Sequence, residues 1–454
     1  MTRGQRDHET GQRGSTDAVP GETHASDWQM QEDAVSVIDD EPTWMMLSRL
    51  ADGNALSDNG KAAAQRLLDR VSGLLGPRWP AAYFARNGRL PAELLMFSTH
   101  RAVLPQFLAF ALRLGEASSE PTFKSVLSAL RKGVEVSGWR HTLLQLEVAR
   151  VCRQAGAAYS FEPAIPGSVH KADLQVEDGA PAPWLVETTT VLRGDVDKAW
   201  EDYEQRFRAT IRRIEYQHAV TCVVAFDDHA DDAVTAEWLA TIELAAAHAQ
   251  SVGVPQQVTS PVGTVTVLAG PPPAGTTLFT GAPQYRNGWH RLGRTLADKA
   301  RQTSGPLPAW VRVDCLDGLF QFTEWARADP HTRVTEIAAA IRQNITWPPH
   351  ARGVVLSTGA GLSIGATDTS VENIDAITSD GIILRRLLAP HLVRETFIIP
   401  LADDAGTHAG LWAAAYDTES YWLDDDLSAA GLPRLAEFWK PAPPPTALES
   451  VTIN

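Results

Sequence analysis

The part of the chain that decides the fold reads WRHTLLQLEVARVCRQA (139–155), AYSFEPAIP (158–166), HKADLQVED (170–178) and WLVETTTVL (184–192). The first segment has apolar residues at helical spacing and is followed by Gly156, which predicts an amphipathic helix that ends there. The other three are rich in β-branched residues or alternate between polar and apolar, and are bounded by Pro or Gly, which predicts three strands.

Two further elements follow this helix and its three strands. Residues 195–216 (DVDKAWEDYEQRFRATIRRIEY) predict a long polar helix capped by Asp195, and AVTCVVAFD (219–227) is an apolar run typical of a buried strand. The order α-β-β-β-α-β over 139–227 predicts an α/β protein with a mixed central sheet. The later elements predicted are helices at 233–250, 288–303, 318–328 and 331–344, a hairpin within 261–280, and strands near 310–316, 353–357, 381–385 and 394–400.

Composition predicts how the chain is organised around this core. The 454 residues are enough for two or three domains. The predicted organisation is a disordered acidic tail (1–42), a helical subdomain (43–136), the α/β core (137–230), an α/β extension that continues the core (231–438) and a Pro-rich loose C-terminus (439–454).

The charge is unevenly distributed. The net charge is −15, from 40 Lys and Arg against 55 Asp and Glu, but residues 1–43 and 402–454 each carry −7, so the middle of the chain is at −1. A nearly neutral body does not exclude a nucleic-acid partner. The three Cys are far apart in apolar runs, which indicates reduced, buried thiols rather than disulfides or a zinc site. With neither a signal-peptide pattern nor a membrane-spanning run, we expect a cytoplasmic protein without a membrane partner.

Three acidic residues lie where carboxylates are costly unless they have partners. Glu147 lies within or beside the apolar stripe of its helix, Asp173 is on the second strand, and Glu187 is on the third. If the hairpin is symmetric about its turn near residue 180, Asp173 lies opposite Glu187, and Lys171 lies opposite Thr189. Two carboxylates so close repel unless a cation lies between them, which predicts a divalent-metal site with Glu147 as a third ligand.

This pattern resembles the PD-(D/E)xK nuclease superfamily, which has the restriction-endonuclease-like fold. The resemblance covers about residues 139–227 and implies one or two Mg²⁺ (or Mn²⁺) ions on Asp173 and Glu187, with Glu147 auxiliary. It also implies a water activated for attack on a phosphodiester. Where the family has its lysine, this chain has Thr189.

A lysine from a neighbouring element would have to replace the missing one. Lys171 is the first candidate because the predicted register places it opposite Thr189, and Lys198 on the following helix is the second. His141, one and a half turns before Glu147, is near enough in sequence to approach the site, but a capping or surface role is favoured. Lys299 is expected to pack near the sheet and is assigned no chemistry. An ion pair of Glu147 with Arg150 or Arg153 is the structural alternative to its role as a ligand.

The sequence therefore predicts a Mg²⁺-dependent nuclease that acts on nucleic acid, with DNA as the expected substrate. A second copy or a partner protein is expected to bind through the N-terminal helices. The main alternative is a catalytically inactive nuclease-fold protein that binds nucleic acid or serves as a scaffold. A third is a Ser hydrolase centred on Ser363, because GLSIG (361–365) fits the G-x-S-x-G pattern and Asp403 and His408 follow it.

Overall fold

The described residues of this computed structural model form two compact units. Those between Asp202 and Pro283 make up a smaller unit, and the others make up a larger unit that contains the elements before and after it in the chain. The structure describes residues 42–51, 56–95, 97, 103–165, 170–191, 195–228, 230–270, 279–280, 288–302, 306–315, 329–357, 362–363, 373–389 and 392–440.

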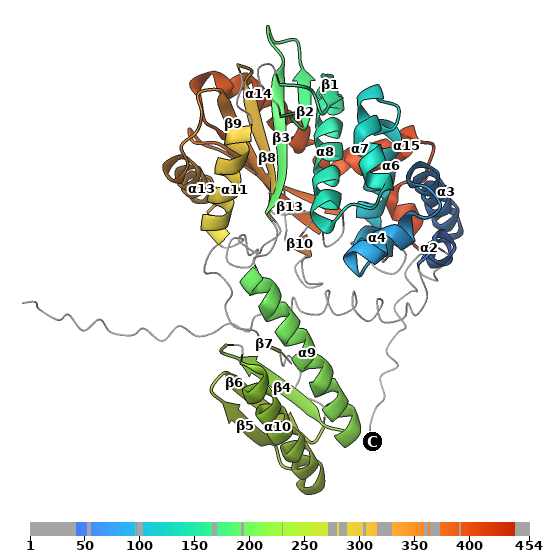
Figure 1. Cartoon of the computed structure of the whole chain (residues 1–454), viewed down its shortest axis with the longest axis vertical. Coiled ribbons are helices and arrows are strands. Elements are labelled where there is room, and N and C mark those ends of the chain that lie inside the picture. Colours follow the sequence, from blue (N-terminus) through green and yellow to red (C-terminus); the bar gives the residue numbers. More distant parts are fainter. Residues whose placement is uncertain are drawn as a thin grey trace, which may run out of the picture. The chain divides into compact units, whose positions relative to one another are not determined.

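The larger unit is built on a nine-stranded mixed sheet (Figure 1). Eight strands follow the order β1-β2-β3-β8-β9-β13-β12-β11, and β10 pairs with β13 beside this path. The strands β3, β8 and β9 are mutually parallel, whereas the other pairs are antiparallel. The strands are β1 (Ala158–Phe161), β2 (Leu174–Glu177), β3 (Trp184–Val191), β8 (Ala309–Cys315), β9 (Ala351–Ser357), β10 (Leu362–Ser363), β11 (Ile374–Ile377), β12 (Ile382–Ala389) and β13 (Leu392–Pro400).

Helices cover both faces of this sheet (Figure 1). One face carries α11 (Gly288–Gln302) and α13 (Pro330–Asn344), and the other carries α8 (Val136–Gln154), α14 (Gly406–Asp417) and α15 (Glu419–Ala429). The remaining helices of the unit pack beyond α8 and α15. They are α2 (Trp44–Ala51), α3 (Asp58–Leu75), α4 (Trp79–Asn87), α5 (Ala92–Leu95), α6 (Leu104–Ala117) and α7 (Lys124–Arg131), with the short 3-10 turns η1 (Pro121–Phe123), η2 (Asp403–Ala405) and η3 (Leu435–Phe438).

Each face of the sheet has its own hydrophobic core. On the α8 face, Trp184, Val186 and Trp310 join the buried residues of the N-terminal helices in one cluster. On the α11 face, a second cluster includes Leu292 and Leu296. The predicted helices within 43–136 are therefore real, but they share the core of the sheet and do not form a separate subdomain.

The smaller unit corrects the predicted core. Residues 219–227 form a strand as expected, but β4 (Thr221–Phe226) pairs with β6 (Gly263–Leu268) and β7 (Phe279–Thr280) in a sheet of its own. The prediction that residues 139–227 make one continuous core is therefore wrong. Helix α11 and strand β8 supply the last two elements instead, because β8 is the parallel neighbour of β3.

The smaller unit contains two more elements. It also differs from the prediction in one further respect. The unit boundary falls within α9 (Asp195–His218), and α10 (Asp232–Val252) follows β4. The hairpin expected within 261–280 is formed earlier, by β5 (Gln256–Ser260) and β6. The predicted tail 1–42, except its last residue, the predicted helix 318–328 and residues 441–454 lie outside the described residues.

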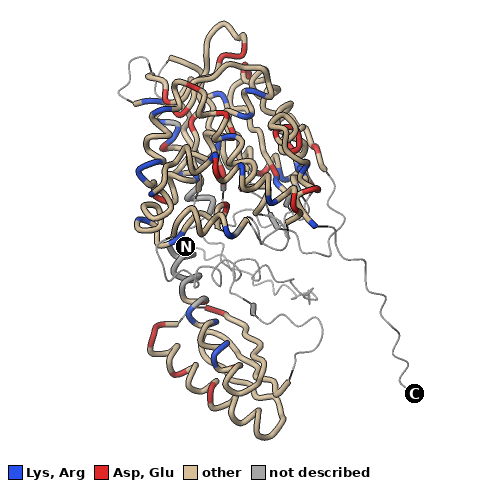
Figure 2. Tube along the Cα trace, turned by 90° about the vertical axis from the view of Figure 1, so that its right-hand side faces the viewer, with Lys and Arg blue, Asp and Glu red and all other residues tan. Residues whose placement is uncertain are grey.

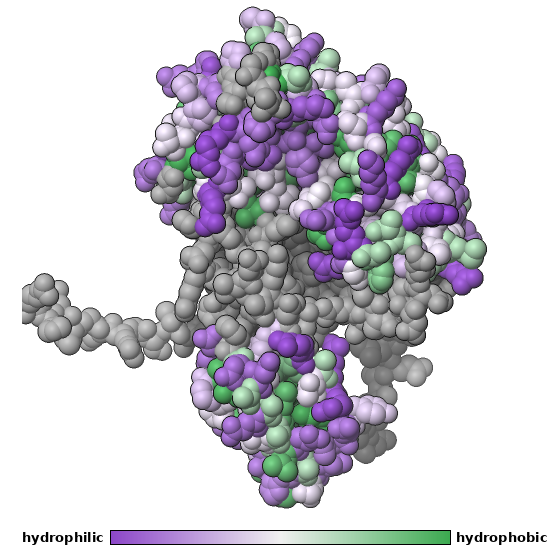
Figure 3. Space-filling model, viewed as in Figure 1, coloured by the Kyte–Doolittle hydropathy of each residue, from purple (hydrophilic) through white to green (hydrophobic). Residues whose placement is uncertain are grey.

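The described surface carries both signs of charge. Basic and acidic positions are interspersed along the larger unit (Figure 2), and hydrophilic residues cover most of its described surface in the view of Figure 3. None of the helices in the described ranges has the length and apolar character needed to cross a membrane. Cys152 and Cys222 are buried free thiols, as predicted.

Candidate functional site

The β2–β3 hairpin has the predicted register. Leu174 lies opposite Val186, and Val176 lies opposite Trp184, and Asp173 and Glu187 are the residues that adjoin the last pair of this ladder. The ladder with β3 ends at Leu174, whereas pairing with β1 on the other edge of β2 continues, since the main chain of Asp173 accepts a hydrogen bond from the backbone N–H of Glu162 (2.9 Å). Asp173 thus lies where the ladder between β2 and β3 ends.

The carboxylate of Asp173 is held by donors from β3 and α8. Its Oδ2 accepts hydrogen bonds from the backbone N–H (2.7 Å) and the hydroxyl (3.1 Å) of Thr188. Its Oδ1 lies 3.0 Å from Nε2 of His141 and accepts a hydrogen bond from Nε2 of Gln145 (3.3 Å). These two α8 residues are one helical turn apart, so they present their side chains on one face of the helix.

Glu187 points to the other side of β3, because successive side chains of a strand alternate between faces. There Lys299 of α11 donates a hydrogen bond from Nζ to Oε2 of Glu187 (3.0 Å), and the same Nζ lies 3.7 Å from Oδ2 of Asp173. One ammonium group therefore neutralises part of the charge of both carboxylates.

The pKa values of the two carboxyls are driven apart. Burial would raise the pKa of Asp173, but hydrogen bonding from His141 and the charges of His141 and Lys299 outweigh it and lower the pKa to about 2. For Glu187, burial and the negative charge of Asp173 raise the pKa to about 7, although Lys299 opposes the shift. Glu187 therefore loses its proton near neutral pH, whereas Asp173 is ionised throughout the physiological range.

One oxygen of this site has no partner. Oε1 of Glu187 is buried, and it has no hydrogen bond to any described residue. A buried carboxylate oxygen without a donor is destabilised unless a proton, a water or an ion reaches it. In the described part of the chain, no group of three or more His, Cys, Asp or Glu side chains is arranged to hold a metal, so an ion here would depend on two carboxylates.

Lys171 does not occupy the predicted position. It forms an isolated bridge with Ala164 and lies 3.7 Å from Glu162, and its side chain is 61% exposed. The prediction that it faces Thr189 is wrong, because the ladder between β2 and β3 ends at Leu174 and does not extend to Lys171.

The structure also locates the two remaining candidates for the lysine function. Thr189 is half-buried and lies on the Glu187 face of β3, and Lys198 is in α9, where its side chain lies outside the described residues. The residue that reaches the carboxylates is Lys299, which the sequence analysis left without chemistry.

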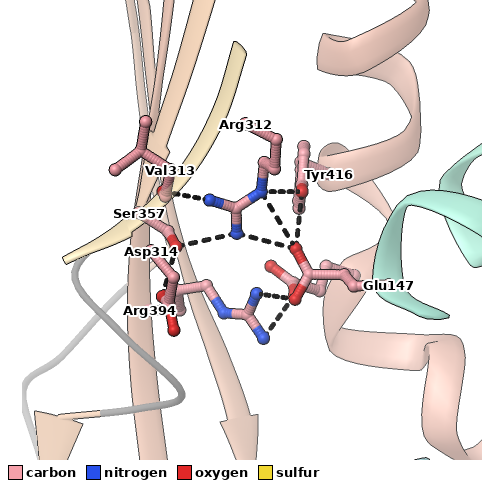
Figure 4. Close-up of polar contacts among 8 residues, drawn as sticks. Glu147, Arg312, Val313, Asp314, Ser357, Arg394 and Tyr416 are labelled. Carbon is pink, nitrogen blue, oxygen red and sulfur yellow. Dashed lines mark hydrogen bonds and ion pairs between the residues drawn. The ribbon is translucent and has the colours of Figure 1, made fainter. Parts of the chain in front are cut away.

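Glu147 belongs to a different cluster, shown in Figure 4. Its Oε1 accepts hydrogen bonds from Nη2 of Arg312 (2.7 Å) and the hydroxyl of Tyr416 (2.6 Å), and its Oε2 accepts one from Nη1 of Arg394 (2.6 Å). Burial would raise the pKa of Glu147, but the charges of Arg394 and Arg312 hold it well below its usual range. Its described partners are Arg312, Arg394 and Tyr416 rather than Asp173 or Glu187, so Glu147 does not join these two carboxylates as the sequence predicted.

The described residues do not form a catalytic triad around Ser363. Ser363 ends the short strand β10, and most of the GLSIG motif lies outside the described residues. His408 stacks on Trp184 (ring centroids 4.7 Å apart), with its Nε2 3.8 Å from a carboxylate oxygen of Asp178. Its described partners are thus in the β2–β3 hairpin.

In comparisons with known proteins, no protein-family model, no curated protein and no solved structure matches the chain.

Proposed function

We propose that this protein is a divalent-metal-dependent nuclease that hydrolyses phosphodiester bonds, with DNA as its substrate. The observation that carries the proposal is the convergence of Asp173, just before β2, with Glu187 of β3 and Lys299 of α11. Two carboxylates and a lysine are the residue types that the PD-(D/E)xK resemblance calls for, and the lysine arrives from a neighbouring element.

The order of elements supports the same proposal. In the larger unit the chain runs α8-β1-β2-β3-α11-β8, with β1, β2 and β3 antiparallel and β3 parallel to β8. This is the α-β-β-β-α-β order expected for a restriction-endonuclease-like core, with the smaller unit inserted between β3 and α11. We infer a core of that type, followed by additional strands from β9 onwards.

The donor set fits a hard divalent cation. Mg²⁺ keeps several waters and is commonly bound through one or two carboxylates, so Asp173 and Glu187 suffice, and the unpartnered Oε1 of Glu187 offers a free lone pair. When bound, Mg²⁺ or Mn²⁺ supplies positive charge that stabilises the negative charge developing on the phosphate.

The protein's own groups have separate tasks in this proposal. Thr188, His141 and Gln145 fix the orientation of the Asp173 carboxylate, so that little reorganisation is needed when a ligand arrives. Lys299, with a side chain only 16% exposed, holds its ammonium group beside both carboxylates. There it is placed to orient a water and to attract a phosphate group.

The test measures cleavage of plasmid and linear DNA by the full chain in Mg²⁺ or Mn²⁺, with EDTA as the metal-free control. We expect Asp173→Asn, Glu187→Gln and Lys299→Met each to lower the rate by about 10²–10³-fold. Lys171→Met is the matched control, because it removes an exposed lysine of the same hairpin and should keep the wild-type rate. Wild-type protein that leaves DNA intact with either metal, or equal cleavage by Asp173→Asn, would exclude the proposal.

The alternative of an inactive nuclease-fold scaffold rested on Thr189 in place of the family's lysine and on the nearly neutral body. Since Lys299 contacts Glu187 directly, the first of these reasons no longer favours an inactive site. Binding of DNA without cleavage, unaffected by divalent ions, is the result that would favour the scaffold.

A further inference from the structure

A second region of the larger unit has the features of a ligand site. A cavity of about 110 Å³ lies among α6, α8 and α15 and the ends of β8, β12 and β13. It includes Glu147 and so borders the cluster of Figure 4. We propose that this cavity binds a small organic oxyanion, a carboxylate or a phosphate monoester, that carries an apolar group.

The walls of the cavity are suited to the apolar group of such a ligand. Ring and aliphatic side chains from three helices line most of the cavity, and its volume is of the order that holds a single aromatic ring. The apolar lining includes Phe110, Leu143, Leu144, Trp422 and Leu423.

The acidic groups of the cavity are already partnered. Glu93 accepts a hydrogen bond from Arg140 (2.8 Å), and Glu419 lies 3.1 Å from Nη2 of Arg394. Glu147 is bound by Arg312 and Arg394, as described above. The fourth acidic residue, Asp314, accepts a hydrogen bond from the hydroxyl of Ser357 (2.9 Å). Glu93, Glu147 and Glu419 are thus each paired with an arginine, whereas Asp314 has a neutral hydrogen-bond partner.

Arg113 is the cation that remains. In the described part of the chain its guanidinium has neither a hydrogen bond nor an ion pair, and its Nε is buried without a partner. The central carbon of the Arg113 guanidinium lies over the Trp422 ring, 5.7 Å from its centroid. Burial lowers the pKa of Arg113, more than the nearby acidic residues raise it. A buried cation in such surroundings is stabilised by an anion.

Arg394 provides a second donor at the same place. It is 7% exposed, and although its two terminal nitrogens bind Glu147 and Glu419, its Nε is buried without a partner among the described residues. An oxyanion in the cavity would thus find the charge of Arg113 and an unused N–H of Arg394. This site is distinct from the Asp173 site, because other residues of α8 line it: Arg140, Leu143, Leu144 and Glu147 here, against His141 and Gln145 there.

The experiment compares ligands of one shape and different charge on the full chain. Phenylacetate and benzyl phosphate are the anionic probes, and phenylacetamide is the neutral control. Thermal unfolding is followed at rising concentrations of each, up to about 10 mM. We expect either anion at about ten times its Kd to raise the Tm by roughly 2 °C, and phenylacetamide to leave it unchanged.

Substitution of the unpaired cation then locates the site. Arg113→Met is expected to fold, since it removes a buried guanidinium whose Nε has no hydrogen-bond partner among the described residues, and to lose the response to anions. Arg66→Met, at an exposed position of α3, is the matched control and should keep that response.

Three results would overturn the proposal: an equal Tm shift with phenylacetamide, an unchanged anion response in Arg113→Met, or no response of the wild type to either anion. The comparison of charges in the wild type decides the matter on its own if the variant does not fold.

Discussion

Glu147 gives the sharpest test, because the sequence predicts a metal ligand at this position, whereas the structure shows a carboxylate paired with two buried arginines. As a metal ligand it would affect cleavage and metal affinity without affecting stability. In the structure it is the buried counter-charge of Arg312, which is 0% exposed, and of Arg394. Removing one partner of a buried ion pair costs about 3–5 kcal/mol, because the other charge is left buried without compensation.

The substitution Glu147→Gln keeps the shape of the side chain and removes the charge. An amide also turns an N–H₂ donor towards guanidinium donors, so at least one of the hydrogen bonds from Arg312, Arg394 or Tyr416 is lost. Arg394 retains Glu419, and Arg312 retains Ser357, so we expect a loss near the lower end of that range, about 3 kcal/mol.

The assay is urea unfolding followed by Trp fluorescence, with Mn²⁺ affinity measured separately by calorimetry. Glu135→Gln is the matched control, because it alters an exposed Glu at the start of the same helix and should change the free energy of unfolding by less than about 0.5 kcal/mol. A Glu147→Gln protein as stable as the wild type but with weakened Mn²⁺ binding would refute the structural role and restore the role of a ligand.

Three further predictions follow from burial. For Glu187 the pKa of about 7 in the folded protein lies above its ordinary value of 4.5, so in EDTA its contribution to stability is fully present below about pH 4.5 and is lost as the pH rises through 7. The free energy of unfolding should fall by up to about 3 kcal/mol over this range, and Glu187→Gln should abolish this part of its pH dependence in urea titrations. The same dependence of the free energy of unfolding on pH in the wild type and in Glu187→Gln would contradict the prediction. Burial raises the pKa of Cys152 and Cys222 to about 12, so neither should be alkylated by iodoacetamide at pH 8 before unfolding, as mass spectrometry can check. Gly353→Ala should cost about 1–3 kcal/mol in urea unfolding, because a Cβ there would lie 2.2 Å from the ring of the buried Trp310; an unchanged midpoint would show that the ring can move.

The local pattern of the sequence was enough for the hairpin and for two of the site residues. Strand residues alternate with a period of two, so the turn near residue 180 and the apolar pattern together determine the register between β2 and β3. That register brings Asp173 and Glu187 to the end of the same ladder. It failed at Lys171, because the ladder with β3 ends at Leu174, although pairing with β1 on the other edge of the strand continues as far as Lys171.

Lys299 could not be found in this way. It reaches Glu187 from 112 residues further along the chain, because the smaller unit separates β3 from α11. Its only signal in the sequence was an amphipathic helix before a buried strand, and α9 followed by β4 has the same pattern. Which helix and strand complete the sheet depends on packing against β3, and a pattern of apolar residues does not encode that choice.

By itself the sequence determined the α/β class, most of the elements around the site, the hairpin register and the paired carboxylates, since all of these follow from periodicity and turns over a few residues. Only the tertiary structure decided that β8 rather than β4 lies beside β3, that Lys299 serves the carboxylates, and that Glu147 neutralises Arg312 and Arg394. The physical reason is that a buried charge takes its partner from whichever element packs against it, and in this chain those partners lie 112 to 247 residues away.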